Sequence, residues 1–309
     1  MPTVLPEEVI AKVNEIQEAD IIVGIPSFRT AKTISHVVRV AGEGIVKFFS
    51  GLKGVVVNTD GGSEDKTMEI ALATPVPRGV KKIVTPYLGL PGKGSAFHAI
   101  FEIADRLGAQ ICVVVDSDLL SITPEWIRLL GEPVLKHNYG FVLPYYLRHK
   151  HDGTITNAIA YPLTRALYGR KVRQPIGGDF GFSGRLAKLY SHENVWETDI
   201  ARFGIDIWMT TLALNEGIRV CQVAMGVKLH DAKDPSTHLK PMFEQVVGTT
   251  FSLMKRYEIR WKALKVSEPV KFFGKMRKAE ELSSIEVDSA KMISQFKKGF
   301  EENKFFWAS

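Results

Sequence analysis

The chain has 309 residues, of which 45% are hydrophobic and 24% charged, and its mean hydropathy is near zero. This composition is that of an ordinary globular protein and excludes collagen-like, low-complexity and wholly disordered chains. The length suits one large α/β domain or two smaller ones, and no apolar run approaches the roughly 18 residues of a membrane span. The acidic N-terminal stretch lacks the apolar core of a secretory signal, and Cys112 and Cys221 both lie in apolar runs. We therefore expect a protein of the reducing cytoplasm.

The formal net charge of +6 points to an anionic partner. Residues 262–309 hold +3 of this excess, from ten basic and seven acidic side chains. The chain has no zinc-finger spacing, no aromatic RNP-type strand and no long basic block, so we expect no nucleic-acid partner. A small anionic substrate is the partner that the motifs below favour.

Apolar runs alternate with segments of helical period along the chain. The predicted strands are residues 21–25, 54–57, 82–85, 111–115, 141–143 and 220–223. Two predicted helices cover residues 33–49 and 94–107. A third begins at Pro124, directly after Thr123, and a fourth includes residues 243–257. This order predicts an α/β fold with a mixed, mostly parallel sheet and helices on both faces. Residues 262–309 are predicted to form a basic, helical C-terminal extension.

Polar clusters follow several of these strands, at the place where open α/β sheets bind ligands. Residues 58–67 include Asp60 and several small residues, which suit the edge of a base or ribose or, alternatively, a plain turn that caps the next helix. Residues 89–95 place Lys93 at the start of a helix, a favourable anion site or simply a helix entry.

The triplet Asp116-Ser117-Asp118, a DXD pattern, directly follows five apolar residues. Ionised carboxylates at the end of a buried strand are costly to desolvate unless they are paired or bound to a metal. The triplet therefore predicts a divalent cation shared with phosphate oxygens, with helix capping as the alternative.

Several short motifs occur together in one order along residues 21–257. They are Pro26-Ser27-Phe28, the turn at 60–65, Pro91-Gly92-Lys93-Gly94, Asp116-Ser117-Asp118, Gln174-Pro175-Ile176-Gly177-Gly178-Asp179, Phe203-Gly204-Ile205-Asp206 and Gly226-Val227-Lys228-Leu229-His230. In this order the chain resembles the GT-A nucleotide-sugar glycosyltransferases, and among them the retaining mannosylglycerate synthases and glucosyl-3-phosphoglycerate synthases. The resemblance implies a Rossmann-like GT-A domain over residues 1–261, with a nucleotide-sugar half near 19–120 and an acceptor half near 121–261.

The resemblance also implies roles for the donor-side residues. Asp118 and His230 would bind Mg²⁺ or Mn²⁺, a reasonable ligand pair beside diphosphate oxygens. The nucleotide sugar would contact Pro26, Phe28, Arg29, Asp60, Lys93, Asp116 and Ser117. The catalytic residues would be Lys93, Asp179 and Asp206, with front-face attack and a covalent intermediate both open as mechanisms. Many GT-A enzymes have an acidic residue near the position of Thr30, which this chain lacks, so the base stays open between uracil and guanine.

On the acceptor side, the segment 148–156 resembles the mannosylglycerate synthase loop, in which an arginine and a threonine eight residues later hold the acceptor. The implied acceptor residues are Arg148, Gly153, Thr156, Gly177 and Gly178. Bidentate binding by arginine suits the carboxylate of glycerate. The phosphoglycerate enzymes carry a basic residue where this chain has Thr154, whereas His149, Lys150 and His151 add charge that would suit a phosphate.

The implied activity is metal-dependent transfer of a glucosyl or mannosyl group to D-glycerate or 3-phosphoglycerate, which makes a compatible solute or its precursor. The donor would be UDP-glucose, GDP-glucose or GDP-mannose. The aromatic residues of the basic extension leave an alternative open, a GT-A transferase that uses a polyprenyl-phosphate acceptor at the membrane surface. The same residues would also suit a homodimer contact.

Overall fold

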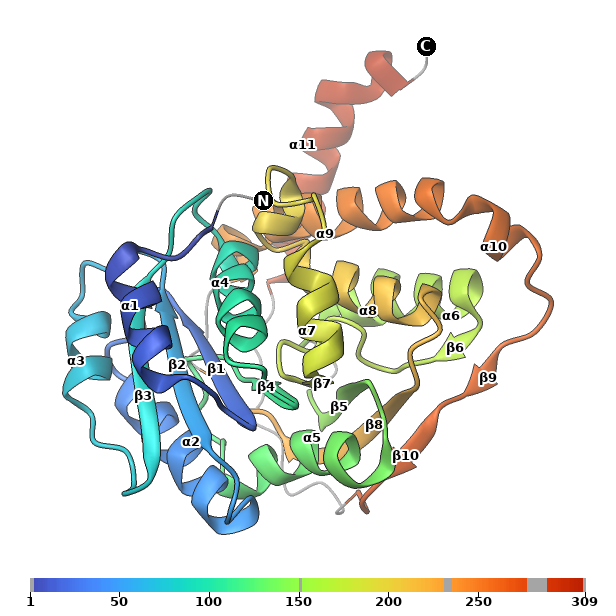
Figure 1. Cartoon of the computed structure of the whole chain (residues 1–309). Coiled ribbons are helices and arrows are strands. Elements are labelled where there is room, and N and C mark those ends of the chain that lie inside the picture. The colour runs from blue at the N-terminus through green and yellow to red at the C-terminus, as the bar shows by residue number, and fades with distance from the viewer. Residues whose placement is uncertain (1–2, 150–151, 231–234, 277–287, 308–309) are drawn as a thin grey trace.

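One sheet of eight strands runs through the part of the chain that the computed structural model describes, residues 3–149, 152–230, 235–276 and 288–307. The strand order is β10-β8-β5-β7-β4-β1-β2-β3 (Figure 1). Strand β7 is antiparallel to β4 and β5, and the other neighbours in the sheet are parallel. Its strands are β1 (Ile21–Ser27), β2 (Gly54–Asp60), β3 (Val80–Pro86), β4 (Ile111–Val114), β5 (Phe141–Leu147), β7 (Phe180–Ser183), β8 (Val220–Val227) and β10 (Lys271–Phe273). The short strands β6 (Arg170–Lys171) and β9 (Glu268–Pro269) pair separately.

Helices cover both faces of the sheet (Figure 1). One face packs against α2 (Ile34–Phe48), α3 (Thr67–Ala73) and α5 (Pro124–His137). The other packs against α1 (Glu7–Ile16), α4 (Lys93–Arg106), α7 (Gly184–Ser191) and α8 (Ile205–Asn215). The remaining helical segments are η1 (Thr156–Ala160), α6 (Tyr161–Tyr168), η2 (Asp199–Ala201), α9 (Pro235–Arg256), α10 (Glu258–Lys262) and α11 (Ser289–Trp307). The mixed, mostly parallel sheet, with helices on both faces and a helix near the C-terminus of the chain, confirms the predicted fold class.

Burial on both faces explains why the strands read as continuous apolar runs. In β1, Ile22 packs into the core on one side of the sheet, and Ile21 and Val23 pack into the core on the other. A strand covered on both sides needs no polar alternation, so its sequence is apolar throughout.

The segment beyond residue 261 contributes strands as well as a helix. Strand β10 pairs with β8 at the edge of the main sheet, and β9 pairs with β6. Helix α11 has no buried residue and projects from the body of the molecule in Figure 1. The predicted boundary at residue 261 stays a prediction.

The sheet gathers polar residues at one edge because the carboxyl ends of parallel strands lie side by side. Asp60 ends β2, Asp116 follows β4, Arg148 follows β5 and Lys228 follows β8. Since β7 runs in the opposite direction, Asp179 at its start lies at the same edge. None of the described helices is long and apolar enough to cross a membrane.

Candidate active site

A buried lysine lies between two carboxylates at the carboxyl edge of the sheet. The Lys228 side chain is only 4% exposed, and its Nζ lies 2.7 Å from Asp116 Oδ2 and 2.7 Å from Asp179 Oδ2. It also donates to the carbonyl oxygen of Gly177 at 3.1 Å. Asp179 is fully buried and accepts two further hydrogen bonds, from the backbone N–H of Asp116 at 2.8 Å and from the Tyr146 hydroxyl. Ion pairing and hydrogen bonding thus compensate the burial of these charges.

A second lysine joins the same carboxylates from the start of α4. Lys93 Nζ lies 2.9 Å from Asp116 Oδ1 and 3.5 Å from Asp206 Oδ1. We refer to Lys93, Asp116, Asp179, Asp206 and Lys228 as the charged cluster. With two ammonium groups and three carboxylates, all ionised, it has a net charge of −1.

Burial and neighbouring charges oppose each other in the pKa values of this cluster. Burial would raise the pKa of Asp116, but the charges of Lys228 and Lys93 outweigh it and hold that pKa well below its usual range. Burial would lower the pKa of Lys93, but Asp116 and Asp206 raise it above its ordinary value. For Asp206, burial prevails over the attraction of Lys93 and raises the pKa. Burial likewise raises the pKa of Asp179. The cluster therefore contains one strongly acidic carboxyl group and two that retain their protons more readily.

Glycine at position 178 lets the backbone approach the charged cluster closely. A Cβ atom there would lie 2.3 Å from Asp116 Oδ2 and 3.1 Å from Lys228 Nζ. Its φ of +85° is also one that side-chain-bearing residues rarely adopt. Gly177 and Gly178, which the motif resemblance assigned to the acceptor, thus border the charged cluster.

The loop that carries Lys93 is packed directly against η2. The backbone N–H of Gly94 donates to the carbonyl oxygen of Arg202 at 3.1 Å, and a Cβ atom at Gly94 would lie 1.8 Å from the carbonyl oxygen of Ile200. Because α8 begins shortly after η2, this contact fixes Lys93 relative to Asp206 in the first turn of α8.

The two predicted metal ligands lie on neighbouring backbone segments. Leu119 and His230 form an isolated antiparallel bridge, and the backbone N–H of Leu120 donates to the carbonyl oxygen of Leu229 at 2.9 Å. This pairing brings the segment after Asp118 alongside His230. Among the described residues, no group of three or more His, Cys, Asp or Glu could hold a metal ion. One carboxylate and one imidazole nevertheless fit a Mg²⁺ or Mn²⁺ ion whose other ligands are diphosphate oxygens and water.

Four of the predicted nucleotide residues, Pro26, Phe28, Arg29 and Asp60, lie around the ends of β1 and β2, and Ser117 follows β4. Asp60 is buried and accepts hydrogen bonds from Ser27 Oγ, Ser63 Oγ and the backbone N–H groups of Gly62 and Ser63, at 2.7–3.0 Å. Its carboxylate therefore holds the turn together. Pro26 and Ser117 are buried, whereas Phe28 is half-exposed, with Arg29 stacked over its ring and paired with Glu64 at 3.3 Å.

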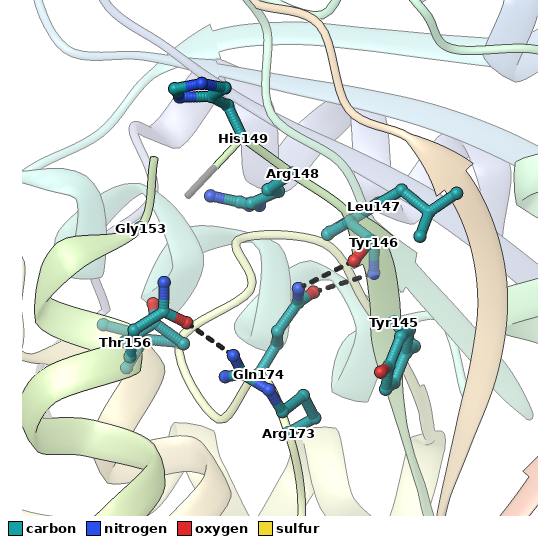
Figure 2. A pocket seen from close by; sticks show the side chains of 11 residues that line it. Tyr145, Tyr146, Leu147, Arg148, His149, Gly153, Thr156, Arg173 and Gln174 are labelled. Atoms are coloured by element: carbon teal, nitrogen blue, oxygen red, sulfur yellow. Dashed lines mark hydrogen bonds between the residues drawn. The ribbon is translucent and has the colours of Figure 1, made fainter. Parts of the chain in front are cut away.

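Beside the charged cluster lies a pocket of about 210 Å³, shown in Figure 2. Three predicted acceptor residues meet there: a Cβ atom at Gly153 would lie 3.5 Å from Arg148 Nη1 and 3.7 Å from Thr156 Oγ1. Tyr146 lines this pocket and bonds Asp179, so it contacts both the pocket and the charged cluster. Thr154 is exposed and does not line the pocket, and Lys150 and His151 lie outside the described residues.

The sequence prediction missed four residues of this region: Tyr146, Arg173, Gln174 and Lys228. Gln174 bonds the backbone of Tyr146 through both ends of its amide, and Arg173 lines the pocket. Lys228 could have been found, because a lysine directly after an apolar strand is exceptional inside a motif that ends in a candidate metal ligand. Tyr146 could not, because an aromatic residue in a buried strand is typical of a core.

Comparison with known proteins gave similarity at the level of solved structures. No family model matches the chain, and no curated protein matches it. The glucosyl-3-phosphoglycerate synthase from Mycobacterium tuberculosis, in complex with Mn²⁺, uridine diphosphate and glucosyl-3-phosphoglycerate, is 25% identical, with a TM-score of 0.60 over 80% of this chain and 85% of that chain. The complex with Mn²⁺, UDP-glucose and phosphoglyceric acid is also 25% identical, with a TM-score of 0.59 over 81% and 85%.

The fold, the charged cluster and these structures together define a glycosyltransferase of the GT-A class. Within that class the chain is similar to the mycobacterial glucosyl-3-phosphoglycerate synthase, which confirms the resemblance seen in the motifs.

Proposed function

We propose that the chain transfers a hexosyl group from a nucleotide diphosphate sugar to D-glycerate or 3-phosphoglycerate. The observation that carries this proposal is the placement of the Arg148 pocket directly beside the charged cluster, with Tyr146 as the shared wall. A donor bound at the cluster and a small acid bound in the pocket would be neighbours. The similar structures contain uridine nucleotides, which supports UDP-glucose over GDP-glucose or GDP-mannose as the donor.

A charge argument supports a divalent metal in this reaction. The charged cluster has three carboxyl groups against two ammonium groups, and a nucleotide diphosphate adds further negative charge beside it. Asp118 and His230 are the residues that would hold Mg²⁺ or Mn²⁺, and the similar structures contain Mn²⁺. When bound, the ion neutralises the diphosphate and stabilises it as a leaving group.

The lysines and carboxylates then have separate tasks. In front-face transfer, the acceptor hydroxyl oxygen forms a bond to the anomeric carbon, the bond from that carbon to the diphosphate breaks, and the hydroxyl proton passes to the departing diphosphate oxygen. Lys93 is placed to stabilise the negative charge that develops on the diphosphate. Asp206 has Lys93 as its ionic partner and is the carboxylate that we place at the sugar. Asp179 is engaged by Lys228, Tyr146 and the backbone of Asp116, so it acts by positioning them.

The acceptor's charge matches the pocket. Arg148 Nη1 lies 3.6 Å from Asp152, and its guanidinium carbon lies 5.2 Å from the centre of the Tyr146 ring. A guanidinium held in this way binds a carboxylate through two parallel hydrogen bonds. We therefore place the acceptor carboxylate at Arg148 and a hydroxyl group of the acceptor near Thr156.

The proposal is tested with an activity matrix in the presence of Mn²⁺. UDP-glucose, GDP-glucose and GDP-mannose are each combined with D-glycerate and with 3-phosphoglycerate, and nucleotide release is measured against a blank without acceptor. We expect acceptor-dependent release with UDP-glucose. Release that no acid stimulates, while UDP-glucose still binds, would overturn the proposed acceptor and leave the GT-A class standing.

The metal site is tested by Asp118→Ala. We expect turnover to fall by roughly 100- to 1,000-fold, the loss typical of removing one strong electrostatic contact at a leaving group. Calorimetry should also show that UDP binding no longer responds to Mn²⁺. Asp105→Ala, near the C-terminal end of α4, is the matched control and should retain full activity. Undiminished activity of Asp118→Ala in EDTA would disprove the metal role.

A further inference from the structure

A second arginine, Arg173, lines the pocket that contains Arg148 (Figure 2). Its position is fixed from two directions. The backbone N–H of Arg173 donates to Gln222 Oε1 at 2.6 Å, and Nη2 donates to Asn157 Oδ1 at 2.8 Å. Its guanidinium carbon also lies 4.9 Å from the centre of the Tyr161 ring. The guanidinium is therefore pre-organised, with little side-chain freedom left to lose when a ligand binds.

Each of the two arginines has an unsatisfied donor. Arg173 Nη1 and Arg148 Nε are both buried and have no hydrogen-bond partner among the described residues. Buried donors without partners are rare in folded proteins because their desolvation is not compensated. Two of them on charged side chains of one pocket indicate a ligand that supplies acceptor atoms to both.

A purely structural role accounts for only part of the Arg173 contacts. The bond to Asn157 ties the guanidinium to η1, and the stacking on Tyr161 covers one of its faces. Neither contact uses Nη1, which is the buried atom left over. In the view of Figure 2, Arg148 and Arg173 lie above and below the middle of the pocket, with Thr156 to one side.

We propose that Arg173 binds a second anionic group of the acceptor and so determines the choice between acids with one anionic group and acids with two. This inference rests on the proposed function. Arg148 takes the carboxylate, and Arg173 takes the group at the other end of the acceptor, which is a phosphate in phosphoglycerate and an uncharged hydroxyl in glycerate. Arg173 thus supplies the phosphate-binding charge that Thr154 does not provide.

The test is the ratio of kcat/KM for 3-phosphoglycerate to kcat/KM for D-glycerate, measured with UDP-glucose and Mn²⁺. Arg173→Gln should lower this ratio about 10- to 100-fold, the size expected for one charge-assisted hydrogen bond, through KM for the phosphorylated acid. Arg173→Lys keeps the charge and should restore part of the ratio. Arg165→Gln removes an exposed arginine of α6 outside the pocket and should leave the ratio unchanged.

Direct binding of the two acids, followed by calorimetry, separates this inference from the proposed function. Weaker binding of 3-phosphoglycerate by Arg173→Gln than by the unmodified chain, at an unchanged melting temperature, would support it. Equal weakening for both acids, or equal affinity of the unmodified chain for both, would overturn it while the proposed function stands. If neither acid binds or reacts, the proposed function fails and the inference fails with it.

Discussion

At the residue scale, the site depends on charges that are buried only because they are paired. Lys228 Nζ lies 2.7 Å from a carboxylate oxygen of Asp116 and 2.7 Å from one of Asp179, and the lysine side chain is almost inaccessible to solvent. Removing one member of such a group leaves the others buried without compensation, which costs far more than the pair contributes. Small changes of backbone position near these residues should therefore have large effects.

Gly178→Ala is the sharpest test of this dependence. The added Cβ atom would meet Asp116 Oδ2 at 2.3 Å, so we expect displacement of Asp116, a loss of about 1–3 kcal/mol in the free energy of unfolding and a large fall in turnover. Gly217→Ala is the matched control, because Gly217 has a φ of +69° and a Cβ atom there would meet no atom within 4 Å. Chemical denaturation and steady-state kinetics of both variants give the comparison. Equal stability losses would mean that backbone conformation alone matters at residue 178.

A buried histidine predicts a pH dependence of stability. His98 on α4 stacks on Trp196 with ring centres 3.9 Å apart, and burial lowers the pKa of His98 from 6.5 to about 4. The unfolded chain therefore binds a proton at this residue more readily than the folded chain. The contribution of neutral His98 to the free energy of unfolding is fully present above pH 6.5. It is lost as the pH falls toward 4, and the loss is up to roughly 3 kcal/mol.

His98→Gln should remove this contribution. Its free energy of unfolding should fall less between pH 7 and pH 4.5 than that of the unmodified chain, measured by denaturant titration. His36→Gln, a histidine of α2, serves as control and should retain the full decrease. Parallel pH curves for the unmodified chain and His98→Gln would show that His98 does not titrate as proposed.

At the element scale, the sequence predicted six of the seven parallel strands of the main sheet and missed two strands, β10 at its edge and the antiparallel β7. Residues 21–25, 54–57, 82–85, 111–114, 141–143 and 220–223 lie in strands, and Val115 of the predicted run 111–115 follows β4. Burial on both faces explains the apolar runs of β1, β2 and β4. Strand β7 has four residues, including Gly181 and Ser183, which resemble a turn as much as a strand. Its place between β4 and β5 is a property of the whole sheet that local pattern does not contain.

The same limit applies to the site. Asp116 and Asp118 were predicted because strand ends are where ligands bind, and Arg148 was predicted because its segment resembles a known acceptor loop. Site residues inside a buried strand, or in a segment that does not follow a strand, were not predicted. Tyr146 reaches the site from inside β5, and Arg173 reaches it from the segment before β7, so only the three-dimensional contacts place them there.

The contact between α4 and η2 gives a prediction at this scale. Gly94→Ala places a Cβ atom 1.8 Å from the carbonyl oxygen of Ile200, so the start of α4 must move away from η2. We expect a loss of about 1–3 kcal/mol in the free energy of unfolding and, because Lys93 moves with the helix, weaker UDP binding. Gly299→Ala in α11, which has open space around it, should be neutral in both measurements. Unchanged UDP binding by Gly94→Ala would show that Lys93 does not depend on this contact.

At the scale of the whole molecule, residues beyond 261 divide into a part that completes the sheet and a part that does not touch the core. Phe273 of β10 packs against Tyr139 with ring centres 5.5 Å apart, whereas α11 has no buried residue. Met292, Ile293, Phe296, Phe300 and Trp307 of α11 are exposed.

Truncation should separate the two parts. Removal of residues 289–309 should change the free energy of unfolding by less than about 0.5 kcal/mol, because no buried contact is lost. Removal of residues 268–309 also deletes β9 and β10 and should cost at least about 2 kcal/mol through the apolar surface that it exposes. Vesicle co-sedimentation of the full chain and the shorter truncation tests the polyprenyl-phosphate alternative, which requires that α11 promote binding to anionic lipid. A large stability loss from the first truncation would mean that α11 packs on the body.

The insertion of β7 between β4 and β5 has a consequence for the order of assembly during synthesis. Strands β4 and β5 follow each other in the chain but do not pair, because β7 lies between them although residues 148–179 separate it from β5 in the sequence. Before β7 is made, β4 has an open edge and β5 has no strand to pair with, because β8 is made later still. Unpaired strand edges of this kind favour aggregation. Asp179 directly precedes β7, so the strand that pairs with both β4 and β5 also brings in the carboxylate that pairs with Lys228. A chain in which β7 fails to insert between β4 and β5 therefore also lacks the ion pair between Asp179 and Lys228.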